Sequence, residues 1–104
     1  MQILIKDRKV DMKFNFRAEM LYEEVNGKSF SGHSNSAWLM YMYCTLISNT
    51  EDGFIGFKEF IEWLSDNPTT FYDFIKYYTN FQANILEMTS QKKKKKVKSK
   101  EEKQ

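Results

Sequence analysis

The sequence predicts an α+β fold that is mainly helical: a short N-terminal β-hairpin packed on about four helices, followed by a disordered basic tail. Near the N-terminus, apolar residues alternate with polar ones at the period of a half-buried strand. Further along, apolar residues recur at helical spacing in separate segments. Lysine then dominates the C-terminal end. We therefore expect one globular domain over residues 1–90 and a flexible lysine-rich tail over residues 91–104.

A hairpin is expected before residue 17. Ile3 and Ile5 lie two residues apart on one side of the polar segment Lys6–Lys9. The apolar residues that alternate on its other side are Val10, Met12, Phe14 and Phe16. The turn contains neither Gly nor Asn, so its type stays open. The second strand is expected to lead through Phe16 into a helix over 17–25, which stops at Asn26-Gly27 because both residues tolerate a positive φ.

Capping signals place the next two helices. Ser34, Asn35 and Ser36 are all favourable N-cap residues, so a second helix should begin there and end near Ser48. Its segment 38–47 is apolar on nearly every face, which is typical of a central helix. The stripe that predicts a third helix consists of Phe57, Phe60, Ile61 and Leu64. Both tryptophans, Trp38 and Trp63, are expected in the core.

A fourth helix is expected from Pro68 to about Met88, because proline suits the first helical position. Its main apolar stripe consists of Phe71, Phe74, Ile75, Tyr78, Phe81 and Ile85. Tyr77, Phe81 and Met88 widen this stripe to one side. Aromatic residues and methionine are enriched in protein interfaces, so these three residues are the candidate partner-binding edge. The alternative interpretation is that a large aromatic core uses all of them.

Charge and composition limit the function classes. The chain has 104 residues and a net charge of +2, but eight lysines and two glutamates give the tail +6 and leave the remainder at −4. The longest apolar run, 37–44, is far shorter than a membrane-spanning helix, so no membrane contact is expected. Cys44 is the single cysteine and cannot form an intramolecular disulfide, which fits a reducing cytosol.

The segment of twelve residues that begins at Ser48 partly matches a calcium-binding EF-hand loop. Gly53 falls at the sixth position, Asp52 at the fifth and Glu59 at the last. However, Ser48 and Thr50 occupy positions where carboxylates or amides belong. Asp52 and Glu59 alone are weak metal candidates, so we favour a helix–turn–helix connection. A degenerate EF-hand-like interaction module stays as the alternative.

Catalysis is not expected, and neither is a cofactor. His33 lies in a Ser/Gly loop without a second His, a Cys or a carboxylate at ligand spacing, and no nucleophile elbow or phosphate-binding loop occurs. Lys92–Lys96 could contact nucleic-acid phosphates, but no aromatic residue is interleaved to stack on bases. A solubilising tail is therefore preferred over a basic-tailed nucleic-acid binder, which stays as a further alternative.

The segment Lys13–Phe30, which contains "FNFRA", "YEE" and "GKSF", resembles the start of the phage tail assembly chaperone family, small proteins of siphophages and prophages. The similarity covers about residues 13–81. It includes the apolar helix 38–47 and "DGFIGFKEFIEWLSDNP", which is similar to the family's third helix. Members often carry a ribosomal slippage site near the end of their first reading frame, which would explain the lysine run without any protein function.

The resemblance implies a non-enzymatic assembly chaperone. Such a protein would bind unassembled phage tail tube subunits, tape measure subunits or both, and would keep them soluble before polymerisation. It would act in the cytoplasm of the host bacterium and be absent from the mature virion. Self-association is left open.

Overall fold

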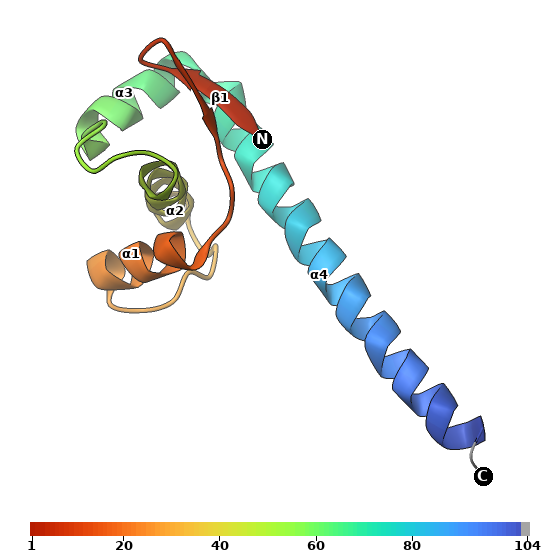
Figure 1. Cartoon of the computed structure of the whole chain (residues 1–104). Helices are drawn as coiled ribbons and strands as arrows, with labels where there is room; N and C mark the ends of the chain where they lie inside the picture. The colour runs from red at the N-terminus through yellow and green to blue at the C-terminus, as the bar shows by residue number, and fades with distance from the viewer. Residues whose placement is uncertain (103–104) are drawn as a thin grey trace. The chain divides into compact units, whose positions relative to one another are not determined.

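The computed structural model describes the backbone of residues 1–102 and the side chains of residues 1–89. In this part of the chain, an antiparallel two-stranded hairpin is followed by four helices (Figure 1), which confirms the predicted fold class. The elements are β1 (Gln2–Ile5), β2 (Arg8–Asp11), α1 (Phe16–Asn26), α2 (Asn35–Ser48), α3 (Phe57–Asp66) and α4 (Pro68–Glu102). The chain divides into two compact units, unit 1 (Met1–Phe74) and unit 2 (Ile75–Gln104).

The hairpin buries Ile3, Ile5 and Val10 on one face, whereas Leu4 on the other face is 60% exposed. Ile3 pairs with Val10 across the two strands, and both side chains are buried. Lys6 and Asp7 form the turn with positive φ angles of 51° and 59°. These are the angles of a type I′ turn, whose twist matches that of the flanking strands. The turn thus forms without glycine, at a conformational cost of about 1–2 kcal/mol per residue.

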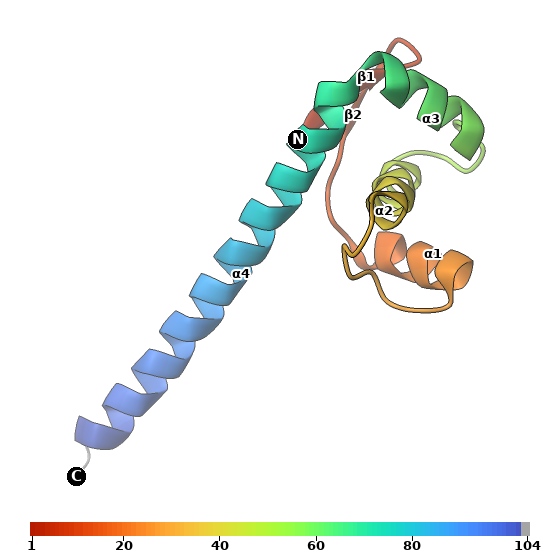
Figure 2. The ribbon, with the colours of Figure 1, turned by 180° about the vertical axis from the view of Figure 1, so that it is seen from behind.

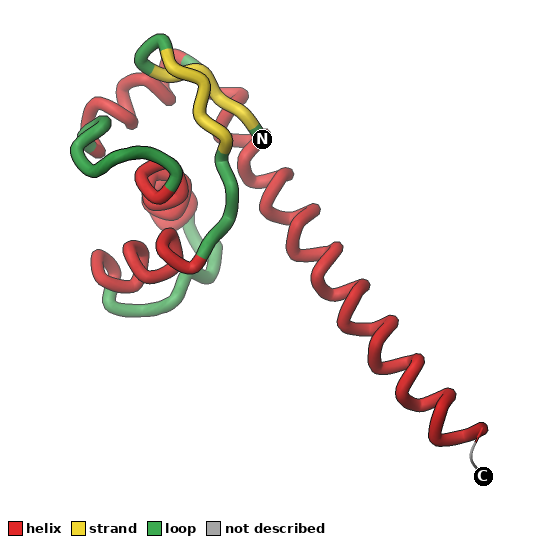
Figure 3. Tube along the Cα trace, in the orientation of Figure 1, coloured by secondary structure: helices red, strands yellow, loops and turns green. Residues whose placement is uncertain are grey.

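The prediction that the second strand continues through Phe16 is wrong. Met12 still donates its N–H to the carbonyl of Met1 at 2.7 Å, but β2 ends at Asp11 and the following segment is a loop (Figure 3). Asn15 is the reason, because its side chain accepts a hydrogen bond from the N–H of Ala18 at 2.9 Å and caps α1. Phe16 is consequently the first residue of that helix and is 85% exposed.

The predicted stop of α1 is confirmed. Gly27 has a φ of 72° and donates its N–H to the carbonyl of Glu23 at 2.7 Å, so it ends the helix in the left-handed conformation. Ala18 and Tyr22 are buried on one face of α1. Val25 is 61% exposed because it lies in the last turn, beyond the part of α1 that is buried.

Helix α2 is central in unit 1, as predicted, and lies between α1 and α3 in both views (Figures 1 and 2). Ser34 caps it, since the serine oxygen accepts a hydrogen bond from the N–H of Ala37 at 3.2 Å. Residues on several sides of α2 are buried: Tyr41, Met42, Cys44, Thr45 and Leu46. The buried hydroxyl of Thr45 donates to the carbonyl of Tyr41 at 2.8 Å, so it is not left unsatisfied.

An aromatic cluster forms around Tyr41, which is 1% exposed. The Phe30 ring stacks on it with centroids 4.2 Å apart, and the rings of Tyr22 and Phe74 lie at 6.0 and 6.1 Å. Its hydroxyl donates a hydrogen bond of 2.7 Å to a carboxylate oxygen of Glu19. Tyr41 therefore joins α1, the loop after it and the start of α4 into one core.

The two tryptophans are less buried than predicted. Both are half-buried at the edge of the core rather than inside it. Trp38 meets the Phe30 ring edge-to-face at 4.8 Å, and Trp63 stacks on Phe60 at 6.3 Å. Smaller aromatic rings occupy the centre of unit 1, and the wide indole rings cover their margin.

Helix α4 begins at Pro68, as predicted, directly after the cap residue Asn67 of α3. Its first turns bury Phe71 and Phe74 in unit 1. Its bounds extend to Glu102, beyond the end near Met88 that the sequence predicts. The division between the units falls within α4 and not at residue 90, where the composition changes. The predicted flexible tail, 91–104, lies outside the residues whose side chains the structure describes and stays a prediction.

Candidate functional site

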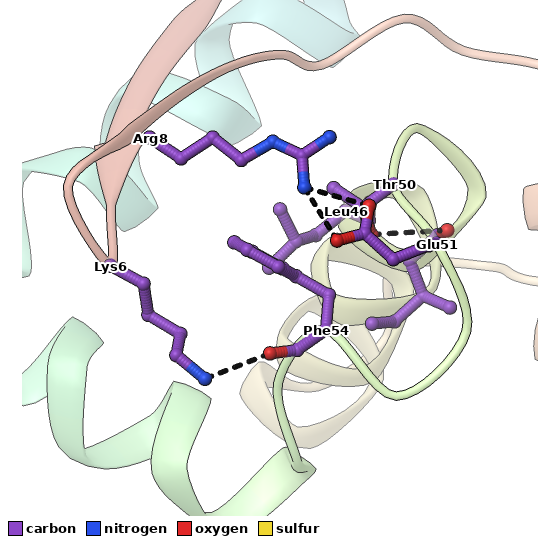
Figure 4. Close-up of polar contacts among 7 residues, drawn as sticks. Lys6, Arg8, Leu46, Thr50, Glu51 and Phe54 are labelled. Carbon is purple, nitrogen blue, oxygen red and sulfur yellow. Dashed lines mark hydrogen bonds and ion pairs between the residues drawn. The ribbon is translucent and has the colours of Figure 1, made fainter.

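The side chains of Lys6 and Arg8 connect the hairpin to the loop between α2 and α3, residues 49–56. The Arg8 guanidinium lies 2.6 and 2.7 Å from the two carboxylate oxygens of Glu51 (Figure 4). Lys6 donates a hydrogen bond of 2.9 Å to the carbonyl of Phe54. The hydrogen bond from Arg8 holds the pKa of Glu51 below its ordinary value. Both cations also lie over the Phe54 ring, 5.6 and 5.2 Å from its centroid, at distances typical of cation–π contacts.

Asp52 and Glu59, the candidate metal ligands, are each paired with a cation of the chain itself. Asp52 binds Arg17 of α1 at 2.6 Å, whereas Glu59 lies 3.6 Å from Lys6. Among the described residues, no group of three His, Cys, Asp or Glu side chains could hold a metal ion. Gly53 supplies a φ of 80° in a turn closed by a 3.1 Å bond from the Phe54 N–H to the Glu51 carbonyl. This geometry is that of a helix–turn–helix connection fixed by ion pairs.

Cys44 is buried in α2. Burial raises the pKa of its thiol from 9.0 to about 11, so the reactive thiolate is rare at neutral pH. Beside it, Tyr43 donates a hydrogen bond of 2.8 Å to the carbonyl of Ile55 and fixes the loop to α2. His33 is exposed in the loop that precedes α2. Because Cys44 is buried and its thiolate is rare, it is a packing residue of the core.

The candidate partner-binding residues lie on the part of α4 that belongs to unit 2. Met88 is 60% exposed and Phe81 is 37% exposed, while Tyr77 is half-buried. Ile85, which is 42% exposed, belongs to the same face, because residues four apart on a helix are neighbours. We call Tyr77, Phe81, Ile85 and Met88 the α4 face. The structure thus brings the three predicted residues onto one side of one helix and adds Ile85 to them.

Leu86 is an apolar residue that sequence reasoning did not select. It is 66% exposed, and it lies about 100° around the helix from Ile85, outside the predicted stripe. A search for periodic stripes does not find such a residue. The sequence signal for Leu86 is an isolated leucine on the polar side of an amphipathic helix. It widens the apolar surface of unit 2 beyond the α4 face.

Comparisons of the chain with protein-family models, with curated proteins and with solved structures give no match. Within the described part of the chain, no helix is both long enough and apolar enough to cross a membrane.

Proposed function

We propose that the protein is a non-enzymatic assembly chaperone that binds unassembled phage tail tube subunits, tape measure subunits or both and keeps them soluble before polymerisation. The observation that carries this proposal is the α4 face, with Phe81, Ile85 and Met88 exposed on adjacent turns of one helix. The resemblance of the segment Lys13–Phe30 to the chaperone family supplies the identity of the client. On this proposal the protein acts in the cytoplasm of the host bacterium and is absent from the mature virion.

The α4 face has the form that one helix presents to a partner's groove. Apolar residues at spacings of three and four along a single helix are the usual anchors of such complexes. Full burial of an Ile, Met or Phe side chain gains about 1.5–3 kcal/mol. With 42% and 60% of Ile85 and Met88 exposed, roughly half of this gain remains to be made when a partner covers them.

The client's chemistry gives the complex its purpose. A tube subunit that has not yet polymerised exposes strand edges, and unpaired edges promote aggregation. A chaperone that covers a client reversibly delays polymerisation until the assembling tail competes for the same surface. Such a role requires apolar binding groups, and the exposed side chains of the α4 face supply them.

Co-expression with the tube subunit encoded by the same phage tests the proposal. The expected product is a soluble complex that contains no nucleic acid. Ile85→Ala combined with Met88→Ala should weaken binding about 30-fold, since anchors at the centre of an interface dominate its energy. The matched control is Asn80→Ala combined with Glu87→Ala, which changes two exposed polar residues of the same helix and should leave affinity unchanged.

The outcomes separate the client from the site. If neither a tube subunit nor a tape measure protein encoded nearby binds, in pull-down or calorimetry, the chaperone proposal is wrong. If binding occurs and the control pair weakens it as much as the α4-face pair does, only the assignment of the site fails. Circular dichroism of each variant establishes that the helix is retained.

A further inference from the structure

Two adjoining hollows lie on unit 1 beside the N-terminal half of α2. The larger has a volume of about 560 Å³ and extends from the end of α1 and the loop 27–34 to α3. The smaller, of about 250 Å³, extends from α3 to the first turns of α4. Leu39 and Ile61 line both hollows, so the two form one groove along α2 and α3. We call it the α2–α3 groove.

The floor of the groove is apolar. Leu39 and Met40 of α2 and Ile61 of α3 are half-buried there, so part of each side chain is still accessible to solvent. At the α4 end, Phe71 is buried, while Tyr72 is 67% exposed. Covering such side chains removes apolar surface from water, which is the main favourable term in most associations.

The opposite end of the groove is polar and basic. Lys28 and His33 line it together with Asn26, Ser31, Ser34 and Ser36. No carboxylate is among the residues that line either hollow. The chain outside the tail carries a net charge of −4, so the positive charge of Lys28 is opposite in sign to the net charge of residues 1–90. An occupant with a negative charge at one end complements this arrangement.

We infer that the α2–α3 groove binds a short peptide segment of a partner protein, with apolar side chains in the hollows and a carboxylate beside Lys28. The two adjoining hollows favour a peptide over a compact small molecule, because each hollow can accept a different side chain. Both hollows are open to solvent, and the serines and the asparagine at the polar end offer hydrogen bonds to peptide amides. The groove lies in unit 1, so this inference does not depend on the α4 face or on the proposed chaperone role.

Binding of three model pentapeptides, each acetylated at the N-terminus and amidated at the C-terminus, to the full chain tests the inference. Each has three leucines followed by two aspartates, two asparagines or two lysines. The methyl resonances of Leu39, Met40 and Ile61 report occupation of the groove directly. The aspartate peptide should shift them with a dissociation constant below about 1 mM, and the asparagine peptide should bind about fivefold more weakly, as expected for an exposed charge pair.

A charge reversal sharpens the test. Lys28 is exposed, so Lys28→Glu should leave the fold intact, weaken the aspartate peptide and strengthen the lysine peptide. Lys58→Glu is the matched control, because it reverses an exposed lysine that lines neither hollow, and it should leave the order of affinities unchanged. Equal binding of the aspartate and asparagine peptides, no methyl shifts up to about 5 mM peptide, or shifts confined to residues 81–88 would each overturn the inference.

Discussion

Phe74→Ala is the substitution that most directly tests how α4 is anchored in unit 1. Phe74 is 0% exposed, and its ring lies 5.8 Å from Phe14, 6.1 Å from Tyr41 and 6.4 Å from Trp38. Removing a buried phenylalanine costs about 3–5 kcal/mol, and each aromatic pair adds about 0.5–1.5 kcal/mol beyond the buried area. We therefore expect a loss near the upper end of the range, about 5 kcal/mol, and a midpoint lowered by roughly 20 °C or more.

Urea and thermal unfolding monitored by tryptophan fluorescence measure this loss, because Trp38 and Trp63 both belong to unit 1. Tyr72→Ala is the matched control, since Tyr72 lies in the same helix and the same unit but is 67% exposed. It should cost less than about 1 kcal/mol. A loss for Phe74→Ala below about 1.5 kcal/mol, or one equal to that of the control, would refute the packing argument.

Three further predictions concern single groups. Calcium should not bind in the sensor range, because Asp52 and Glu59 are paired with cations of the chain; a dissociation constant of about 10⁻⁵ M or tighter in calorimetry would contradict this. Burial raises the pKa of the Cys44 thiol from its ordinary value of 9.0 to about 11, which lowers the thiolate fraction at pH 8 about 100-fold. Alkylation of Cys44 in the folded protein should therefore be at least about 100-fold slower than in denaturant. Comparable rates would show that the thiol is accessible. Arg8→Gln should raise the Glu51 pKa toward 4.5 in a carboxyl NMR titration. Because the pKa of Glu51 is lower in the folded protein than in the unfolded chain, the pair stabilises the fold at pH values above the unfolded pKa, and this stabilisation is lost as the pH falls through the folded pKa. An unchanged Glu51 titration in the Arg8→Gln variant would mean that Arg8 does not bind Glu51 in solution.

Local signals made much of the fold predictable from the sequence. Gly27 ends α1 and Pro68 begins α4, as predicted, and Ser34, one of the three N-cap candidates, caps α2. Each of these signals acts over about one helical turn, so the residue type and its nearest neighbours are sufficient. The central position of α2 was predictable for a similar reason, since a helix that is apolar on nearly every face requires neighbours on several sides.

Features that depend on distant partners were not predictable. The alternation through Phe14 and Phe16 is typical of a strand, yet Asn15 caps a helix at that point, and only the register of the hairpin shows where pairing ends. Arg8 and Glu51 are separated by 43 residues, and nothing in either local sequence indicates that they meet.

The candidate site shows the same division. The residues of the α4 face share one helix, so their spacing predicts that they lie together. The α2–α3 groove, in contrast, is lined by the loop 27–34 and by residues of all four helices, and its shape follows from how they pack. No periodicity within a single segment predicts such a surface.

Polymerisation of the purified tail tube subunit, followed by light scattering with and without an equimolar amount of this protein, tests the proposed chaperone role most directly. The chaperone proposal predicts a longer lag and a soluble complex. The Ile85→Ala, Met88→Ala pair should abolish the delay, and the Asn80→Ala, Glu87→Ala pair should retain it. An unchanged time course with the unmodified protein, for both the tube subunit and the tape measure protein, would contradict the proposal.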